Sequence, residues 1–97
     1  MVFWAWRMLH LDLDSRYADV LERALYNGAV SGVSMDGKRF FYVNPLESRG
    51  DVHRQPWFAC SCCPPNVARL VASFGQYVYS ESRSEACVHL YVQGKAE

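Results

Sequence analysis

Three of the chain's four cysteines fall within four residues, immediately before two prolines and an apolar run with helical spacing. The three are Cys60, Cys62 and Cys63. A thiolate is both a nucleophile and a soft metal ligand. Proline is tolerated in the first turn of a helix, so we expect Pro64 or Pro65 to open one. The peptide dipoles at its N-terminus would favour the thiolate forms of Cys62 and Cys63. The cluster is therefore a candidate metal site or reactive thiol site.

Spacing alone leaves a third interpretation open, in which the cysteines are reduced and buried beside a helix end. Structural zinc sites usually combine two pairs of ligands, and this chain carries one pair. The bend at Pro64 lets Cys62 and Cys63 share a metal ion, but a tetrahedral zinc needs further ligands. His53 is the nearest candidate in sequence, although a loop histidine is more often solvated. Cys87 lies on a strand-like run, where we expect a small buried apolar residue.

Composition limits the classes of protein that the chain can represent. Its 97 residues are 51% apolar and 14% aromatic, which suits one small domain. Ten basic residues balance ten acidic ones without a block of like charge, so we expect neither a nucleic-acid partner nor a polybasic membrane contact. Arg7 and His10 interrupt the apolar start, which lacks the features of a signal peptide. We therefore expect reduced cysteines and a cytoplasmic setting.

Three helices follow from apolar spacing. Residues 2–11 are apolar nearly all round a helix, which therefore needs cover on most faces. Asp14 is expected to cap a second helix that runs to about Asn27, with Gly28 as its left-handed C-cap. The helix after the cysteines is expected to run from about Pro65 and to end in the same way near Gly75.

Two hairpins are expected in addition to the helices. Residues 32–35 and 39–43 flank an Asp-Gly turn signal, and residues 77–79 and 86–92 flank a polar turn. Between the first hairpin and the cysteines lies a polar connection with three basic or imidazole side chains, Arg49, His53 and Arg54. Most such side chains are solvated, and a substrate-facing role for one of them stays open.

Three separated stretches together resemble glycoside hydrolase family 127, the family of bacterial β-L-arabinofuranosidases. They are residues 57–70, which include Cys62-Cys63-Pro64-Pro65-Asn66, and residues 17–28 and 41–46. The resemblance implies an α+β fragment made of helices from an (α/α)6 barrel, with β-hairpins that lead into a β-sandwich. Residues 1–76 would be the late part of the catalytic barrel with an inserted hairpin, and residues 77–97 the start of the following β-region.

The resemblance also implies a role for each cysteine of the cluster. In this family a zinc site is built from a Glu-x-Cys motif and two adjacent cysteines, which match Cys62 and Cys63. Cys62 would be a zinc-bound nucleophile that forms a thioglycosyl intermediate in a retaining reaction, and Cys63 a second ligand to the metal. Cys60 would support the site without binding zinc. The Glu-x-Cys motif and the acid/base glutamate lie upstream of the matched region.

We therefore expect this chain to have an incomplete zinc site and no acid/base residue, and to be inactive in isolation. An L-arabinofuranoside-containing saccharide would be the substrate of the parent enzyme. The alternative is a small zinc-binding or thiol interaction module without hydrolase activity, and a third interpretation is a structural remnant without a site. Self-association is also expected, because the apolar first helix would lack neighbours.

Overall fold

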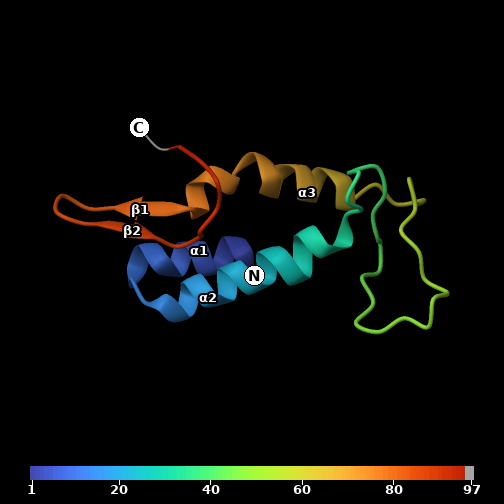
Figure 1. Cartoon of the computed structure of the whole chain (residues 1–97), viewed down its shortest axis with the longest axis horizontal. Helices are drawn as coiled ribbons and strands as arrows, with labels where there is room; N and C mark the ends of the chain where they lie inside the picture. The colour runs from blue at the N-terminus through green and yellow to red at the C-terminus, as the bar shows by residue number, and fades with distance from the viewer. Residues whose placement is uncertain (96–97) are drawn as a thin grey trace.

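The computed structural model describes residues 1–95 as an elongated molecule of 51 × 26 × 22 Å. Figure 1 shows α1 (Val2–Leu11) and α2 (Ser15–Arg23) packed side by side, with α3 (Cys63–Ala72) along the same bundle. The long connection from 33 to 62 extends beyond one end of the helices, and the strands β1 (Tyr79–Glu81) and β2 (Ala86–Val88) lie at the other end. The combination of helices with a small antiparallel sheet confirms the coarse α+β prediction. Within residues 1–95, no helix has both the length and the apolar character to cross a membrane.

The predicted cap of α2 is confirmed. A carboxylate oxygen of Asp14 accepts the backbone N–H of Arg16 at 2.9 Å, and the other oxygen accepts the Arg16 Nε–H at 2.9 Å. The first turn of a helix leaves N–H groups without partners, so this carboxylate satisfies one of them and fixes where α2 begins. The short segment from Asp12 to Asp14 therefore turns the chain back along α1.

The predicted left-handed cap at Gly28 is wrong. After α2 the chain stays helical through a wider π turn, η1 (Ala24–Ala29), and a 3-10 turn, η2 (Val30–Gly32). Among the described residues only Gly37 and Gly50 have positive φ. Leu25 is buried and Ala29 packs against the core, so the apolar face continues beyond the glycine. Burial of that face accounts for continued helix where local sequence indicated an end.

Helix α3 begins at Cys63, two residues before the predicted start near Pro65, and both prolines lie in its first turn. The predicted C-cap at Gly75 is wrong. The helix ends at Ala72, and Gly75 lies without positive φ inside a 3-10 turn, η3 (Phe74–Tyr77). The Ser73 hydroxyl lies 2.6 Å from the Tyr77 hydroxyl, and Tyr77 is only 1% exposed. The end of this helix is therefore set by the burial of Tyr77.

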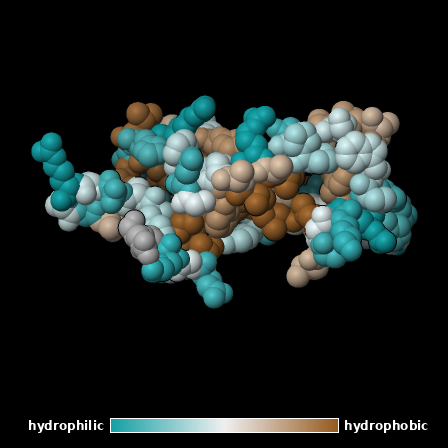
Figure 2. All heavy atoms as spheres, turned by 90° about the horizontal axis from the view of Figure 1, so that it is seen from above, coloured by the Kyte–Doolittle hydropathy of each residue, from teal (hydrophilic) through white to brown (hydrophobic). Residues whose placement is uncertain are grey.

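One core joins the helices to the β-region. Viewed from above in Figure 2, hydrophobic residues gather at the middle of the molecule. The buried cluster consists of Val2, Ala5, Leu9, Leu21, Leu25, Leu70, Tyr77 and Leu90. Helix α1 is confirmed, yet it is only partly covered: Trp4 is 50% exposed and Leu11 is 80% exposed. The expected self-association stays a prediction.

The first predicted hairpin forms with fewer hydrogen bonds than two full strands. Val33 pairs with Phe40 as an isolated antiparallel bridge, and Phe40 also pairs with Gln55 from the polar connection. Only Gly37 of the Asp-Gly turn takes positive φ, at 69°, so the turn is not the two-residue type that the sequence indicated. The paired segments still lie beside the start of α3, where they form one side of the hollow described below.

The second predicted hairpin is confirmed with shorter strands. The strands β1 (Tyr79–Glu81) and β2 (Ala86–Val88) pair antiparallel, with Ser80 opposite Cys87. Tyr77, expected in the first strand, lies in η3 instead.

Candidate active site

The start of α3 presents the cysteine pair that the sequence singled out. The Sγ atoms of Cys62 and Cys63 lie 3.7 Å apart, with Cys62 exposed and Cys63 half-buried. The Asn66 side-chain amide donates to the Cys62 carbonyl at 2.8 Å, which ties the first turn of the helix to the residue that precedes it. The two thiols therefore face the same side of a fixed helix end.

The spacing of these sulfurs fits a shared zinc ion. Two sulfurs bonded to one tetrahedral zinc lie about 3.8 Å apart, because each Zn–S bond is about 2.3 Å long. The observed separation of 3.7 Å is close to that value. The donor chemistry also fits, because thiolates are preferred zinc ligands. Cys62 and Cys63 could therefore supply two of the four ligands.

The cysteine pair opens onto a hollow of about 290 Å³ between α3 and the first hairpin. The end of the α2–η1–η2 helix closes its third side through Gly28, Ala29 and Gly32. Most of the hairpin wall is apolar, including Phe40 and Phe41. The polar side chains that line the hollow are Tyr42, Asn44, Cys62, Cys63 and Asn66. A mixed apolar and hydrogen-bonding lining of this size suits a small polar ligand such as one sugar ring.

Cys60 lies beside this pair and interacts with both Cys62 and Tyr42. The backbone N–H of Cys62, the Cys62 thiol and the Tyr42 hydroxyl together lower the pKa of Cys60 below its usual value. The same contact with Cys60 raises the pKa of Tyr42. The Cys60 thiol and then the Cys63 thiol raise the pKa of Cys62 to about 11. Without a metal ion, Cys62 is therefore protonated at neutral pH.

The candidate ligand His53 and the fourth cysteine, which was expected to be a small buried residue, lie elsewhere. His53 is exposed on the polar connection, and half-buried Cys87 is on β2 at the opposite end of the molecule from the cysteine cluster (Figure 1). Within residues 1–95, no group of three or more histidine, cysteine, aspartate or glutamate side chains is arranged to hold a metal ion. The structure does not place His53 with Cys62 and Cys63.

Sequence reasoning missed Tyr42 and Asn44 as site residues. Both belong to the aromatic run and the Asn-Pro stop that indicated a strand and its end. Their place in the hollow depends on pairing of the hairpin with a segment near Gln55, which no local pattern specifies. The only available signal was the position of Tyr42 near the end of a predicted strand, two residues before Asn44.

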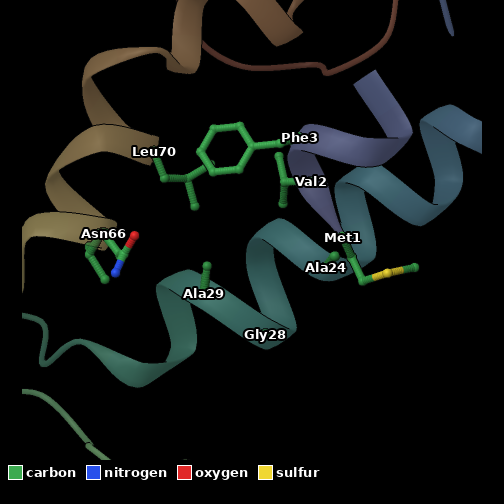
Figure 3. Close-up of a pocket in the computed structure, with 9 residues that line it drawn as sticks. Met1, Val2, Phe3, Ala24, Gly28, Ala29, Asn66 and Leu70 are labelled. Atoms are coloured by element: carbon green, nitrogen blue, oxygen red, sulfur yellow. The ribbon is translucent and has the colours of Figure 1, made fainter. Parts of the chain in front are cut away.

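A second hollow of about 380 Å³ lies on the other side of Asn66 and is mainly apolar. Figure 3 shows Val2 and Phe3 of α1 directed toward Leu70 of α3, with Ala29 and Gly28 below them. This opening separates α1 from the first turns of α3. It contains none of the cysteines.

The sequence itself matches a described family of enzymes. A sequence model of the β-L-arabinofuranosidase GH127 catalytic domain matches residues 1–76. The chain belongs to this family. A non-reducing end β-L-arabinofuranosidase from Bifidobacterium longum subsp. longum is 42% identical over 110 aligned positions, which cover 100% of this chain and 17% of that enzyme.

Solved structures agree with this GH127 assignment. A GH127 β-L-arabinofuranosidase from Geobacillus stearothermophilus T6 matches 94% of the chain and 16% of its own length, with 55% identity and a TM-score of 0.82. A second GH127 β-arabinofuranosidase matches 93% of the chain and 14% of its own length, with 51% identity and a TM-score of 0.87. This GH127 chain thus spans about one sixth of the length of the relatives that it matches.

Proposed function

We propose that this chain supplies the nucleophile and a second zinc ligand to a retaining GH127 hydrolase that acts on β-L-arabinofuranosides. Cys62 is the nucleophile and a zinc ligand, and Cys63 is the adjacent ligand. The observation that carries the proposal is the 3.7 Å sulfur pair at the mouth of the hollow, in a chain of this family. Cys60 supports the pair through its contact with Cys62 and is not itself a ligand.

Cys62 needs help to act as a nucleophile at neutral pH. Its neighbours raise its pKa to about 11, so the metal-free thiol holds its proton. Bound zinc keeps a coordinating thiol deprotonated. The N-terminal dipole of α3 favours negative charge on both thiols in addition. These effects together make the Cys62 sulfur available for attack.

The remaining residues of the hollow bind and orient the sugar. Tyr42, Asn44 and Asn66 offer hydrogen-bonding groups, and the aromatic wall at Phe40 covers an apolar face of the ring. The Cys62 sulfur attacks the anomeric carbon while the bond to the leaving-group oxygen breaks. Water then displaces Cys62 from the thioglycosyl adduct, and the two inversions together retain configuration.

The proton for the leaving group must come from elsewhere. Among the described residues that line the hollow there is no aspartate, glutamate or histidine. General acid catalysis typically contributes a factor of about 10² to 10⁴ to the rate. We therefore propose that the 97-residue chain alone lacks hydrolase activity, and that a longer GH127 polypeptide provides the acid and the other zinc ligands.

A hybrid enzyme tests the proposal directly. The matching segment of the G. stearothermophilus enzyme is replaced by this chain, and hydrolysis of an aryl β-L-arabinofuranoside is followed in the presence of methanol. We expect activity with a methyl glycoside product of retained configuration, and loss of at least about 10³-fold with Cys62→Ala. Cys87→Ala is the matched control and should keep activity. An active Cys62→Ala hybrid, or an inverted product, would refute the proposed nucleophile.

Zinc analysis of the isolated chain separates the hydrolase segment from the alternative module. As a segment with two of four ligands, the chain should lose zinc on dialysis, whereas a stoichiometric zinc that survives dialysis would favour the module. Cys62→Ser and Cys63→Ser should each weaken zinc binding, and Cys87→Ser should not. The cytoplasmic setting, in which these thiols would stay reduced, remains a prediction.

A further inference from the structure

Arg54 joins two segments that are far apart in sequence. Its terminal guanidinium nitrogen donates to the Ser31 carbonyl at 2.6 Å, and its Nε donates to the Gly32 carbonyl at 3.3 Å. These carbonyls belong to the C-terminal end of a helix, where carbonyl groups lack partners within the helix and positive charge is favoured. The guanidinium carbon also lies 4.5 Å from the centre of the Phe41 ring. One cation thus holds both a helix end and the hairpin.

The two segments that Arg54 holds are two sides of the hollow. Gly32 and Phe41 both line it, and the Phe41 N–H donates to the Gly32 carbonyl at 3.0 Å. Next to Arg54, Gln55 exchanges two backbone hydrogen bonds of 2.9 Å with Phe40. The wall opposite Cys62 is therefore fixed from outside by Arg54 and Gln55. Arg54 is not among the residues that line the hollow, which distinguishes it from a sugar-binding residue.

We propose that Arg54 is a positioning residue, which clamps the hairpin wall to the helix end at Gly32 and so sets the width of the hollow facing Cys62 and Cys63. The inference rests on the proposed function for the use of that hollow, whereas the clamp itself stands on the contacts of Arg54. A flat guanidinium can bind two carbonyls and cover a ring at once, and lysine cannot do all three. This role differs from the substrate-facing one that the sequence left open for one of Arg49, His53 and Arg54.

The clamp is tested first in the metal-free 97-residue chain by the rate at which N-ethylmaleimide modifies each cysteine. We expect Arg54→Ala to accelerate modification of half-buried Cys63 roughly tenfold, equivalent to about 1.4 kcal/mol of lost closure. The rate of Cys63 modification in Arg54→Lys should lie between the rates in Arg54→Ala and in the unmodified chain. Cys87, on β2, is the internal control, and its rate should be unchanged. Arg49→Ala removes the same charge from the same connection and should behave like the unmodified chain.

An unchanged Cys63 rate in Arg54→Ala would overturn the clamp, as would equal acceleration by Arg49→Ala. If Arg54→Ala fails to give the far-ultraviolet circular dichroism of a folded chain, Arg54→Lys against Arg49→Lys decides the same question. Faster reaction of Cys63 in Arg54→Lys only would then support the clamp.

The positioning role is tested in the hybrid enzyme described above. Because Arg54 shapes the hollow without touching reacting atoms, Arg54→Ala should raise KM about tenfold and change kcat less than about threefold, with partial recovery in Arg54→Lys. A faster Cys63 rate with an unchanged KM would overturn the positioning role and leave a purely structural clamp. An inactive hybrid with the unchanged chain would count against the proposed function, while the Cys63 rates still decide the clamp.

Discussion

The side-chain amide nitrogen of Asn66 lies 2.8 Å from the carbonyl oxygen of Cys62, one helical turn earlier in the chain. This bond restrains the residue that we propose as nucleophile. Loss of one hydrogen bond costs about 1 kcal/mol, so Asn66→Ala should weaken zinc binding by the 97-residue chain about fivefold. Asn66→Asp should weaken it further, because a carboxylate would face a carbonyl oxygen and two thiolates. Titration against a chromophoric chelator measures both.

The matched control for this prediction is Asn27→Ala, which removes an asparagine side chain of η1 that does not line the cysteine hollow. Its zinc affinity should equal that of the unmodified chain. Unchanged affinity in Asn66→Ala would mean that the first turn of α3 holds Cys62 without this bond.

The paired hydroxyls of Ser73 and Tyr77 make a second, structural prediction. Tyr77 is 1% exposed, and its hydroxyl lies 2.6 Å from the Ser73 Oγ. Tyr77→Phe keeps the buried ring and removes this hydrogen bond, so the free energy of unfolding should fall by about 1 kcal/mol. Tyr91→Phe, at a side chain that is 91% exposed, should change it negligibly. Urea unfolding measures both variants, and equal stability of the two would contradict the argument.

The sequence predicted features that depend on neighbouring residues and missed those that depend on distant ones. The Asp14 cap and the start of α3 follow from local chemistry, and both are present. The glycine signals at Gly28 and Gly75 were misleading, because burial of Leu25 and of Tyr77 keeps the backbone helical around them. A C-cap signature carries no information about what the following residues will bury.

The candidate site divides in the same way. Adjacent cysteines ahead of a proline predicted that Cys62 and Cys63 lie together where a helix begins, because both belong to one helix end. The opposite wall could not be predicted, since it needs Arg54 to reach Ser31 across 23 residues and Phe40 to pair with Gln55. Contacts of that range leave no periodic pattern in the sequence.

The cap of α2 should make stability depend on pH. The side-chain hydrogen bond from Arg16, and then its backbone N–H, lower the pKa of Asp14 below the usual 3.8. A carboxyl with a lowered pKa in the folded state stabilises that state above the unfolded-state pKa, and the effect disappears as pH falls through the folded-state pKa. The chain should therefore lose stability as pH falls below about 4.

Asp14→Asn is the informative variant for this prediction, because asparagine caps a helix equally well and does not titrate in this range. Urea midpoints measured from pH 6 to pH 2 should fall less steeply for Asp14→Asn than for the unmodified chain. Other carboxyls with a lowered pKa, such as Asp36, affect the pH dependence of stability equally in the unmodified chain and in Asp14→Asn, so their effect cancels in the comparison. Parallel curves would show that the Asp14 cap does not depend on its charge.

In the metal-free chain, an alkylating reagent should modify Cys60 before Cys62, although Cys62 is the proposed nucleophile. In the metal-free chain the pKa of Cys60 is below its usual 9.0, and that of Cys62 is raised to about 11. Because the thiolate is the reactive form, iodoacetamide at pH 8 should label Cys60 well before Cys62.

Tyr42→Phe removes a hydroxyl that stabilises the Cys60 thiolate, so it should raise the pKa of Cys60 and slow its labelling. Tyr79→Phe, on β1, is the control and should change neither the pKa nor the labelling rate of Cys60. Peptide mass spectrometry across pH 6 to 10 gives both rates. Faster labelling of Cys62 than of Cys60 in the absence of metal would show that the protein alone lowers the pKa of Cys62. Zinc would then not be needed to deprotonate the Cys62 thiol.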